Sequence, residues 1–334
     1  MAEKKLRGGI VGCGFFSQFH VEAWPRVRGA ELVAACDVDA TRAHAAAPAA
    51  YTNLEAMLDS EKLDFLDIAA RPELHLEMVR AAAHRKIPVI CQKPMAPSYS
   101  ECLEIAEVAK HAGIRLMIHE NWRWQAWYRQ VRVMISKGDI GQPITYHFRT
   151  RRRDGLGTEP YQAQPYFRNY SRLLLYETLI HPIDTARFLF GDIVRVYAEL
   201  RRNNPLIEGE DQALLLTRHA SHLCGVIDGH RFLDLAPNSG PLGDAVFEGD
   251  GGILWVSGTG DIFRRTPSGD ENLAWKNIVP HGYRGDSVHA TQQHFVDCLV
   301  SGAEFESSAE NYLKSVAVME AGYRSSETGQ AILL

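Results

Sequence analysis

A glycine-rich turn directly after the first apolar run constrains the fold of this chain more than any other feature. The run Leu6–Val11 is predicted to be a buried strand, and Gly12, Gly14 and Ser17 follow it. In such a turn the first glycine permits a tight bend, the second lets backbone approach a pyrophosphate, and the third residue must be small for the helix to pack on the strand. Ser17 stands where glycine is usual and is still small. The turn therefore favours a dinucleotide site, the alternative being a purely structural turn.

A carboxylate at the end of the next apolar run strengthens the dinucleotide interpretation. Asp37 directly follows the run Glu31–Cys36, about twenty residues beyond the turn, where an acid binds the adenosine ribose hydroxyls. A carboxylate there repels a 2′-phosphate, and Val38 offers no cation, so NAD is favoured over NADP. Arg42 could accept a phosphate, but it is expected to face water. Asp37 could otherwise serve only as a helix cap.

Short apolar runs alternate with helical stretches throughout residues 1–120. The runs Phe65–Ala69, Val89–Cys91 and Leu116–His119 continue the series as buried strands, so that the strand ending at Cys91 is the fourth. Helices are predicted at Leu74–His84 and Ser98–His111, and the alanine-rich Ala43–Ala50 is expected to be helix and turn. Strands alternating with helices indicate a doubly wound parallel sheet. We expect residues 1–120 to form a dinucleotide-binding Rossmann domain.

The residue composition and the pattern of apolar runs change after residue 120, which predicts a second domain over residues 121–334. An aromatic- and arginine-rich segment, Trp122 to Tyr170, precedes a helix near Leu174–Phe190, and turn-rich separators then divide alternating runs that favour an open, largely antiparallel sheet. We expect an α+β domain for substrate binding and oligomerisation, whose terminal helices can return to pack on the first domain. The predicted strands are Val194–Arg201, Ala213–Arg218, Leu223–Asp228, Ala245–Glu248, Ile253–Val256 and Ile262–Arg265, and the terminal helices lie near Ser287–Val300 and Ser308–Thr328.

Composition places the chain among ordinary enzymes. Its 334 residues are 46% hydrophobic, enough for two cores, and a net charge of −5 gives no basic field for nucleic acid. The run Arg151–Arg153 is too short for a polyanion track and is expected to be a solvated face or to contact substrate. The six cysteines show no metal-ligand spacing, so no metal is expected. There is no apolar signal core and no membrane-length apolar run, which predicts a cytoplasmic protein without a membrane partner.

A lysine and a histidine far apart in the sequence are the candidate catalytic residues. Lys93 follows a predicted parallel strand, at the edge where open α/β sheets bind ligands. Oxidising a carbinol or hemiacetal requires a base, and histidine titrates near neutrality, whereas a lysine, with a reference pKa of roughly 10.4, must first be perturbed. We expect His181 to accept the proton and Lys93 to hydrogen bond the reacting oxygen, with the reverse assignment left open. The alternatives are a turn lysine and a core histidine.

Two acids flank His181 at helical spacing. Glu177, His181 and Asp184 stand at i, i+4 and i+7, and Pro182 requires that the helix begin near it or kink there. Asp184 could orient the imidazole, bind a sugar hydroxyl or be an ordinary helix acid.

The aromatic segment mixes flat apolar side chains with amides and guanidinium groups, as sugar sites do. Asn121 is the favoured contact to substrate or nicotinamide ribose, and Arg123 and Tyr128 follow it, whereas the tryptophans are expected to be core. A loop that covers the nicotinamide is predicted to hold Tyr161, Gln164, Phe167 and Arg168.

In this order the motifs resemble those of the glucose–fructose oxidoreductase, inositol dehydrogenase and rhizopine-catabolism family (Gfo/Idh/MocA). The resemblance covers essentially the whole chain and is carried by Gly12-Cys13-Gly14, Asp37, Arg71-Pro72-Glu73-Leu74-His75, Gln92-Lys93-Pro94 and His181-Pro182-Ile183-Asp184. It implies a Rossmann domain, a C-terminal α+β domain and NAD(P)-dependent oxidation of sugars or polyols. The cofactor residues that we expect are Gly12, Gly14, Phe15, Phe16, Asp37, Arg71, Pro72, His75, Gln92, Lys93, Asn121 and Gln164. The expected substrate residues are Asn121, Arg123, Tyr128, Phe167, Arg168, Glu177 and Asp184.

Three positions depart from the family pattern. Gln92 replaces the glutamate of the usual Glu-Lys-Pro, Glu177 replaces an aspartate one turn before the histidine, and Arg71 stands where threonine or asparagine precedes Pro72. The lysine and the histidine both remain, so the departures bear on how substrate and cofactor are held.

A narrower likeness is to the branch that oxidises D-apiose at its anomeric carbon to a lactone. It is carried by the stretch from His119 to Arg129 and by Gln164-Pro165-Tyr166-Phe167-Arg168. An inositol or other polyol dehydrogenase is the alternative within the family. A non-catalytic NAD(P)-binding sugar sensor and an NAD-assisted lyase or glycosidase are alternatives of other classes. We expect a homo-oligomer, a dimer or a tetramer, because one face of the second sheet is left uncovered.

Overall fold

The computed structural model describes residues 5–233 and 243–334, and the chain forms two compact units. The first unit is Met1–Trp124 with Pro280–Leu313, and the second is Gln125–Val279 with Lys314–Leu334. No helix in the described part of the chain is long and apolar enough to cross a membrane.

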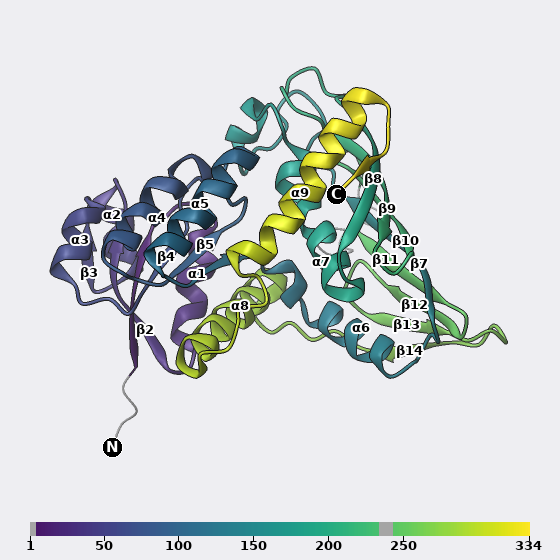
Figure 1. Cartoon of the computed structure of the whole chain (residues 1–334), viewed down its shortest axis with the longest axis horizontal. Coiled ribbons are helices and arrows are strands. Elements are labelled where there is room, and N and C mark those ends of the chain that lie inside the picture. Colours follow the sequence, from purple (N-terminus) through teal and green to yellow (C-terminus); the bar gives the residue numbers. More distant parts are fainter. Residues whose placement is uncertain (1–4, 234–242) are drawn as a thin grey trace. The chain divides into compact units, whose positions relative to one another are not determined.

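The first unit contains a six-stranded sheet in the order β3-β2-β1-β4-β5-β6, and every neighbouring pair in it is parallel (Figure 1). This is the doubly wound order of a dinucleotide-binding fold, so the predicted fold class is confirmed for this unit. The strands are β1 (Leu6–Val11), β2 (Ala30–Cys36), β3 (Ala49–Tyr51), β4 (Phe65–Ile68), β5 (Val89–Gln92) and β6 (Leu116–His119). The helices are α1 (Ser17–Ala23), α2 (Ala40–Ala46), α3 (Leu54–Ser60), α4 (His75–His84), α5 (Tyr99–Ala112) and α8 (Gly282–Ser301), with 3-10 turns at Trp24–Arg26, Pro72–Leu74 and Trp122–Trp124.

The prediction that Ala43–Ala50 is helix and turn was wrong at its end. Helix α2 stops at Ala46, and Ala49–Tyr51 forms β3, which pairs in parallel with Ala34–Cys36 of β2. Consequently the strand that precedes Lys93 is the fifth along the chain and not the fourth. An edge strand of three residues with two alanines has too little apolar content to be recognised by periodicity, and pairing with β2 decides its conformation.

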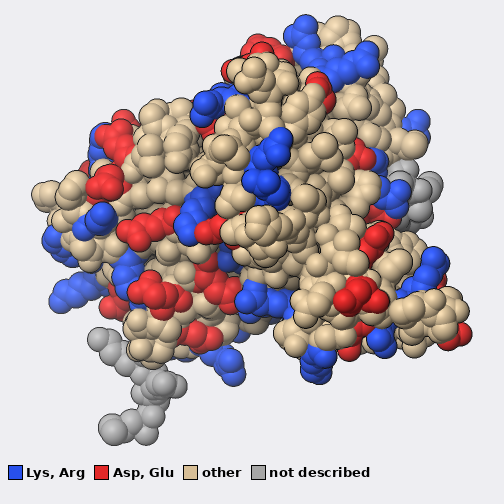
Figure 2. Space-filling model, turned by 45° about the vertical axis from the view of Figure 1, so that its right-hand side comes forward, with Lys and Arg blue, Asp and Glu red and all other residues tan. Residues whose placement is uncertain are grey.

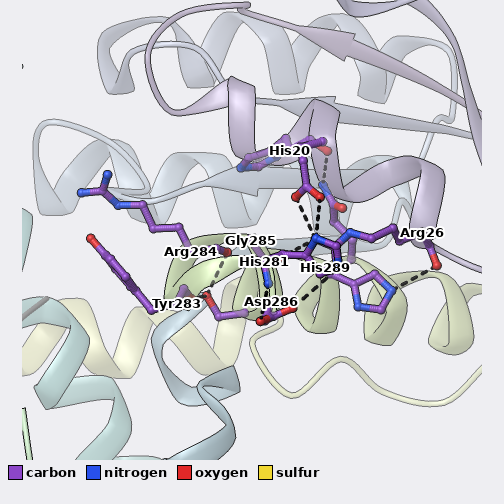
Figure 3. A network of polar contacts seen from close by, with 11 residues as sticks. His20, Arg26, His281, Tyr283, Arg284, Gly285, Asp286 and His289 are labelled. Carbon is purple, nitrogen blue, oxygen red and sulfur yellow. Dashed lines mark hydrogen bonds and ion pairs between the residues drawn. The ribbon is translucent and has the colours of Figure 1, made fainter. Parts of the chain in front are cut away.

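Helix α8 comes from late in the chain and packs in the first unit. Phe295 on α8 lies edge to face on Phe65 of β4, with ring centroids 5.6 Å apart, and both belong to a core cluster with Trp24. Polar contacts join α8 to the segment that follows α1 (Figure 3): the Arg26 guanidinium donates to the Gly285 carbonyl at 2.9 Å and lies 3.7 Å from the Asp286 carboxylate. These contacts fix α8 against β4 and the turn that follows α1.

The second unit contains a nine-stranded sheet in the order β14-β13-β12-β11-β7-β10-β9-β8-β15 (Figure 1). Only β7 and β10 pair in parallel within it, so the prediction of a largely antiparallel sheet is confirmed. The strands are β7 (Pro143–Arg151), β8 (Ile193–Arg201), β9 (Gln212–His219), β10 (Cys224–His230), β11 (Asp244–Gly249), β12 (Gly252–Val256), β13 (Ile262–Arg265), β14 (Glu271–Trp275) and β15 (Ile332–Leu333).

Strands β7, β14 and β15 were not predicted. In β7, Tyr146, Phe148 and Thr150 are buried while the residues between them are more exposed, which is the period-two pattern of a half-buried strand. The many charged and polar residues of this segment obscured that alternation in the sequence.

Helices cover one face of the second sheet and leave much of the other face exposed. The Leu179 side chain lies over Gly229 of β10, whereas Leu214 and Leu216 of β9 are 41% and 49% exposed on the opposite face. The helical segments of this unit are α6 (Ala126–Ser136), a π-helix (Leu174–Leu179), α7 (Ile180–Phe190) and α9 (Ala309–Thr328), whose first residues belong to the first unit.

Pro182 lies where the type of helix changes. Helix α7 begins at Ile180, two residues before Pro182, and the π-helix Leu174–Leu179 precedes it without a break.

Candidate active site

The glycine turn has the geometry of a nucleotide cradle. Gly12 adopts φ +87°, and a Cβ there would lie 2.6 Å from the backbone of Ala70, so only glycine fits. At Gly14 a Cβ would meet no atom within 4 Å, which leaves open space beside the backbone. The buried Ser17 donates its hydroxyl to the Gly14 carbonyl at 2.7 Å and so ties helix α1 to the turn. Ser17 thus does more than fill the small-residue position.

Asp37 is anchored beside this turn. One carboxylate oxygen accepts the Cys13 backbone N–H at 2.7 Å, and the other accepts the Asp39 N–H at 2.9 Å. Burial, with the Asp37 charge nearby, raises the pKa of the Cys13 thiol to about 12, so this thiol stays protonated and is no nucleophile. The turn and the carboxylate therefore present a phosphate cradle and a ribose acceptor side by side, which fits an NAD molecule.

The last residue of β5, Gln92, has a buried side chain whose amide is hydrogen-bonded inside the protein. Gln92 is 5% exposed, its amide oxygen accepts the Lys93 backbone N–H at 2.6 Å, and its amide nitrogen lies 3.0 Å from Nε2 of His20. The side chain of Gln92 thus holds the lysine backbone, and any contact between Gln92 and cofactor is left to its main chain.

His75 is also engaged inside the protein. Its Nδ1 lies 3.1 Å from the Met95 carbonyl and its Nε2 lies 3.1 Å from the Ala70 carbonyl. Burial lowers the pKa of His75, so the ring is neutral and donates to one of these carbonyls at a time. We therefore interpret His75 as a brace between the segments that follow β4 and β5. Arg71, just before the buried Pro72, is exposed.

Asn121 and Arg123 are held by late segments of the chain. The Asn121 amide donates to the Ser287 hydroxyl on α8 at 2.8 Å, and the Arg123 guanidinium donates to the Glu306 carbonyl at 2.8 Å. Both side chains are buried.

The second unit carries His181 in a helical segment with unusual pitch. Glu177 lies in the π-helix and accepts the Thr178 hydroxyl at 2.6 Å, while His181 is a buried residue in the first turn of α7. Asp184 is fully buried and accepts the Ser315 hydroxyl of α9 at 2.9 Å. Glu177 thus contacts its neighbour in the π-helix, and Asp184 contacts α9 through Ser315.

A buried glutamate that we did not predict holds the start of the π-helix. Glu210 accepts the backbone N–H groups of Leu173 and Leu175 at 3.2 and 2.9 Å and the Tyr323 hydroxyl at 2.7 Å. Burial raises the pKa of Glu210 although these hydrogen bonds lower it. In the sequence, Glu210 stands in a polar loop before β9, where nothing signals a partner so distant along the chain.

The predicted nicotinamide-covering loop has its own small core. Phe167 is 3% exposed and packs edge to face on Tyr161, and the Arg231 guanidinium lies 5.1 Å from the Tyr161 ring centroid. Arg168 donates to the Pro160 carbonyl at 2.7 Å, and Gln164 donates to the Tyr166 hydroxyl. Tyr128 is likewise buried, against Phe148. Phe167 and Tyr128 therefore act at least partly as core residues.

One cation near the glycine turn was missed. The Arg284 guanidinium at the start of α8 lies 5.8, 5.2 and 5.1 Å from the ring centroids of Phe15, Phe19 and Tyr283, and no carboxylate pairs with it among residues 5–233 and 243–334. Figure 3 shows Arg284 and Tyr283 extending from the same end of α8. Its distance along the chain from the turn hid this contact.

Comparisons with known proteins agree with this geometry. Residues 6–120 match the oxidoreductase family with an NAD-binding Rossmann fold, and residues 128–239 match the GFO/IDH/MocA C-terminal domain. The D-apiose dehydrogenase of Paraburkholderia graminis is 35% identical over 99% of this chain and 90% of its own length. The chain belongs to the Gfo/Idh/MocA oxidoreductase family.

Two further relatives span nearly the whole chain. The D-apiose dehydrogenase of Rhizobium rhizogenes is 32% identical over 98% of this chain and 97% of its own. An oxidoreductase from Agrobacterium radiobacter, solved with NAD⁺, L-tartaric acid and magnesium, superposes with a TM-score of 0.91 at 32% identity over 99% of this chain and 98% of that one. The family assignment thus holds for both units and establishes NAD as the cofactor class of the first.

Proposed function

We propose that this protein is an NAD-dependent dehydrogenase that oxidises D-apiose at its anomeric carbon to a lactone. The observation that carries the proposal is the full-length similarity to two D-apiose dehydrogenases, combined with a strand-end lysine and a buried histidine in the order typical of the family. The nucleotide cradle at Gly14 and the ribose acceptor Asp37 support the cofactor half of the proposal.

The proposed division of labour follows the two units. The first unit binds the dinucleotide through the glycine turn and Asp37 and carries Lys93, Asn121 and Arg123. The second unit supplies His181 and the remaining sugar contacts. When bound, NAD supplies the nicotinamide ring that accepts the hydride. His181 takes the hydroxyl proton of the sugar, and Lys93 donates a hydrogen bond to the same oxygen and shares the proton relay. In the reverse assignment, Lys93 is the base and His181 is the hydrogen-bond donor.

Asp37 supports NAD over NADP for a geometric reason. Its two oxygens are fixed by the backbone N–H groups of Cys13 and Asp39, so the carboxylate cannot swing away from a 2′-phosphate. Arg42 lies 3.4 Å from the neighbouring Asp39 carboxylate, which competes for its charge.

Arg284 is proposed as a further cofactor contact. Its guanidinium lies 5.8 Å from the ring centroid of Phe15, the residue after Gly14, without a partner carboxylate in the described ranges. A cation at this place suits the pyrophosphate anion. Arg284→Met should raise the Kd for NAD about ten-fold, measured by tryptophan fluorescence, while Arg264→Met on β13 should leave it unchanged.

The cysteines bear on the cellular compartment, and the exposed face of the second sheet bears on assembly. The six free cysteines suit a reducing compartment, so we propose a cytoplasmic protein. The exposed leucines of β9 suit a homo-oligomer built on the open face of the second sheet. Figure 2 shows basic and acidic side chains interspersed on the face in view, which does not present a single-sign field to a polyanion.

A substrate panel tests the function. NAD is incubated with D-apiose, other aldoses and myo-inositol, and NADH formation is followed. D-Apiose should give the highest kcat/KM. Faster oxidation of myo-inositol would favour a polyol dehydrogenase, and nucleotide binding without net NADH would favour a sensor or a lyase.

A further inference from the structure

A chain of buried polar groups runs beneath the end of β5. The His20 Nδ1 lies 2.9 Å from the Asp67 carboxylate, which also accepts the Trp24 indole N–H at 2.8 Å. On the other side, His20 Nε2 lies 3.0 Å from the Gln92 amide nitrogen. His20 and Asp67 are 0% exposed, so solvent cannot replace any of these contacts.

The donors and acceptors of this chain have only one consistent arrangement. The Lys93 backbone N–H can only donate, so the Gln92 atom that it meets at 2.6 Å is the oxygen. The amide nitrogen of Gln92 therefore donates to His20 Nε2, which must accept. It follows that the imidazole proton is on Nδ1 and points at Asp67.

The neighbours of His20 hold it in this place. The ring of His119 packs on it with centroids 4.2 Å apart, and Gln292 of α8 donates to its backbone carbonyl at 3.3 Å. Asp67 and His119 are the titratable groups that face the His20 ring in the described contacts. Every member of the chain from Asp67 to the lysine backbone is thus fixed by its neighbours.

We propose that Asp67, His20 and Gln92 form a hydrogen-bond chain of fixed polarity that positions Lys93, with Asp67 setting its direction. These are positioning residues, since they reach the lysine only through its backbone N–H. The role of Lys93 facing the substrate rests on the proposed function, but the polarity of the chain does not.

This arrangement also accounts for the glutamine in place of the glutamate of the usual Glu-Lys-Pro. A carboxylate at position 92 would face the lone pair of His20 Nε2 while Asp67 held the proton on the far side of the ring. The buried negative charge of this chain instead lies at Asp67, on the opposite side of the histidine. In this chain, then, the charged group and the amide lie on opposite sides of one imidazole.

The proposal is tested by exchanging the carboxylate at position 67 and the amide at position 92. Asp67→Asn and Gln92→Glu each disturb the chain: the first leaves a buried amide N–H₂ without an acceptor, and the second either sets a carboxylate against the Nε2 lone pair or draws a second proton onto a buried imidazole between two carboxylates. In the double variant, the new amide at position 67 donates to Nδ1, and Nε2–H donates to the new carboxylate at position 92. That carboxylate still accepts the Lys93 N–H, so the chain is complete with its polarity reversed at the imidazole. Each single variant should lower kcat about ten- to a hundred-fold, and the double variant should recover most of that loss.

Two readouts separate positioning from general destabilisation. The Kd for NAD, measured by titration without sugar, should be little changed in all three variants, whereas kcat falls in the single variants only. Glu31→Gln, an exposed carboxylate-to-amide change on β2, should leave kcat unchanged. A double variant no better than the poorer single one, or an Asp67→Asn variant with wild-type kcat, would overturn the proposal.

The tautomer of His20 gives a test that does not depend on enzyme activity. In ¹⁵N-histidine-labelled wild-type protein, the His20 ring should show a protonated Nδ1 and an unprotonated Nε2, and the double variant should show the reverse. The signal is assigned by its loss in His20→Asn or, if that variant does not fold, by its coupling to labelled Gln92. An Nε2–H or doubly protonated ring in the wild type would contradict the chain, whatever sugar the enzyme uses.

Discussion

The two units support their site residues on buried polar groups of different kinds. Beneath Lys93, the first unit uses a single carboxylate, Asp67, which is satisfied by neutral N–H donors. Beside His181, the second unit uses a chain that ends in ion pairs: Asp184 accepts from Ser315, Ser315 accepts from Arg187, and Arg187 pairs with Asp192 at 2.8 Å.

This difference has a physical consequence. A chain of neutral donors has direction, so it fixes the orientation of what it touches, and no ion from solvent can replace its members. An ion-pair chain that reaches Lys314 at the surface mainly ties α7 to α9. We therefore expect changes in the first chain to affect kcat and changes in the second to affect stability first.

The largest effects should come from the two catalytic residues. His181→Ala and Lys93→Ala should each lower kcat about 10²- to 10⁴-fold, because each removes a group that acts on the reacting proton or oxygen. The Kd for NAD should stay close to the wild-type value, since the glycine turn and Asp37 are unchanged. If both groups serve one relay, the double variant should be little worse than the poorer single one.

Lys110 and His111 are exposed residues on α5 and provide control substitutions. Lys110→Ala and His111→Ala should keep wild-type turnover. Wild-type turnover in His181→Ala would reject it as the base. Wild-type turnover in both catalytic variants would remove the proposed site.

The second unit provides a matched pair for stability. The Arg187 side chain is 4% exposed and that of Lys314 is 57% exposed, and both pair with Asp192. Arg187→Met should lower the free energy of unfolding by about 3–5 kcal/mol, because it removes the buried guanidinium that contacts Ser315 and Asp192. Lys314→Met should cost less than about 1 kcal/mol. Urea unfolding measures both, and equal losses would refute the ion-pair chain as a buried anchor.

Cofactor choice should depend on Asp37. In Asp37→Ala the ratio of kcat/KM for NAD to that for NADP should narrow about ten-fold, since the repulsion of a 2′-phosphate is removed. The wild type should prefer NAD. A clear NADP preference in the wild type would contradict the role given to this carboxylate.

The smallest expected effect is that of Asp228, on the exposed face of the second sheet, on stability at acid pH. Burial raises the pKa of Asp228, but hydrogen bonding and charge from His147 and Arg151 outweigh it and hold the pKa at about 2, below the ordinary 3.8. A depressed carboxyl pKa stabilises the fold above pH 4, and this contribution is lost as the pH falls from about 4 to about 2. Asp228→Asn should flatten the unfolding free energy over that window, and an unchanged slope would assign it to other acids.

The sequence allowed prediction of what depends on local pattern. The glycine turn, Asp37 and Lys93 were found because each sits at the end of an apolar run, and the parallel and antiparallel sheets followed from the two kinds of periodicity. Helix α5 shows why such predictions succeed: Ser98 caps it, Gly113 ends it, and Cys102, Ile105 and Ala109 form its buried face.

What was missed depends on contacts between distant segments. His20 and Asp67 looked like ordinary helix and strand residues, and only the folded sheet places them on Gln92. Arg284 and Glu210 were missed for the same reason, because their partners lie far along the chain. Strand β3 was missed because its neighbour, more than its own residues, decides its conformation.

The most direct test of the account follows the hydrogen from the sugar to the cofactor. D-Apiose that carries deuterium at its anomeric carbon is incubated with wild-type enzyme and NAD, and the reduced cofactor is analysed by mass spectrometry. We expect NADH that carries deuterium at C-4 of the nicotinamide, together with one equivalent of lactone. Unlabelled NADH, or sugar conversion without NADH, would contradict it.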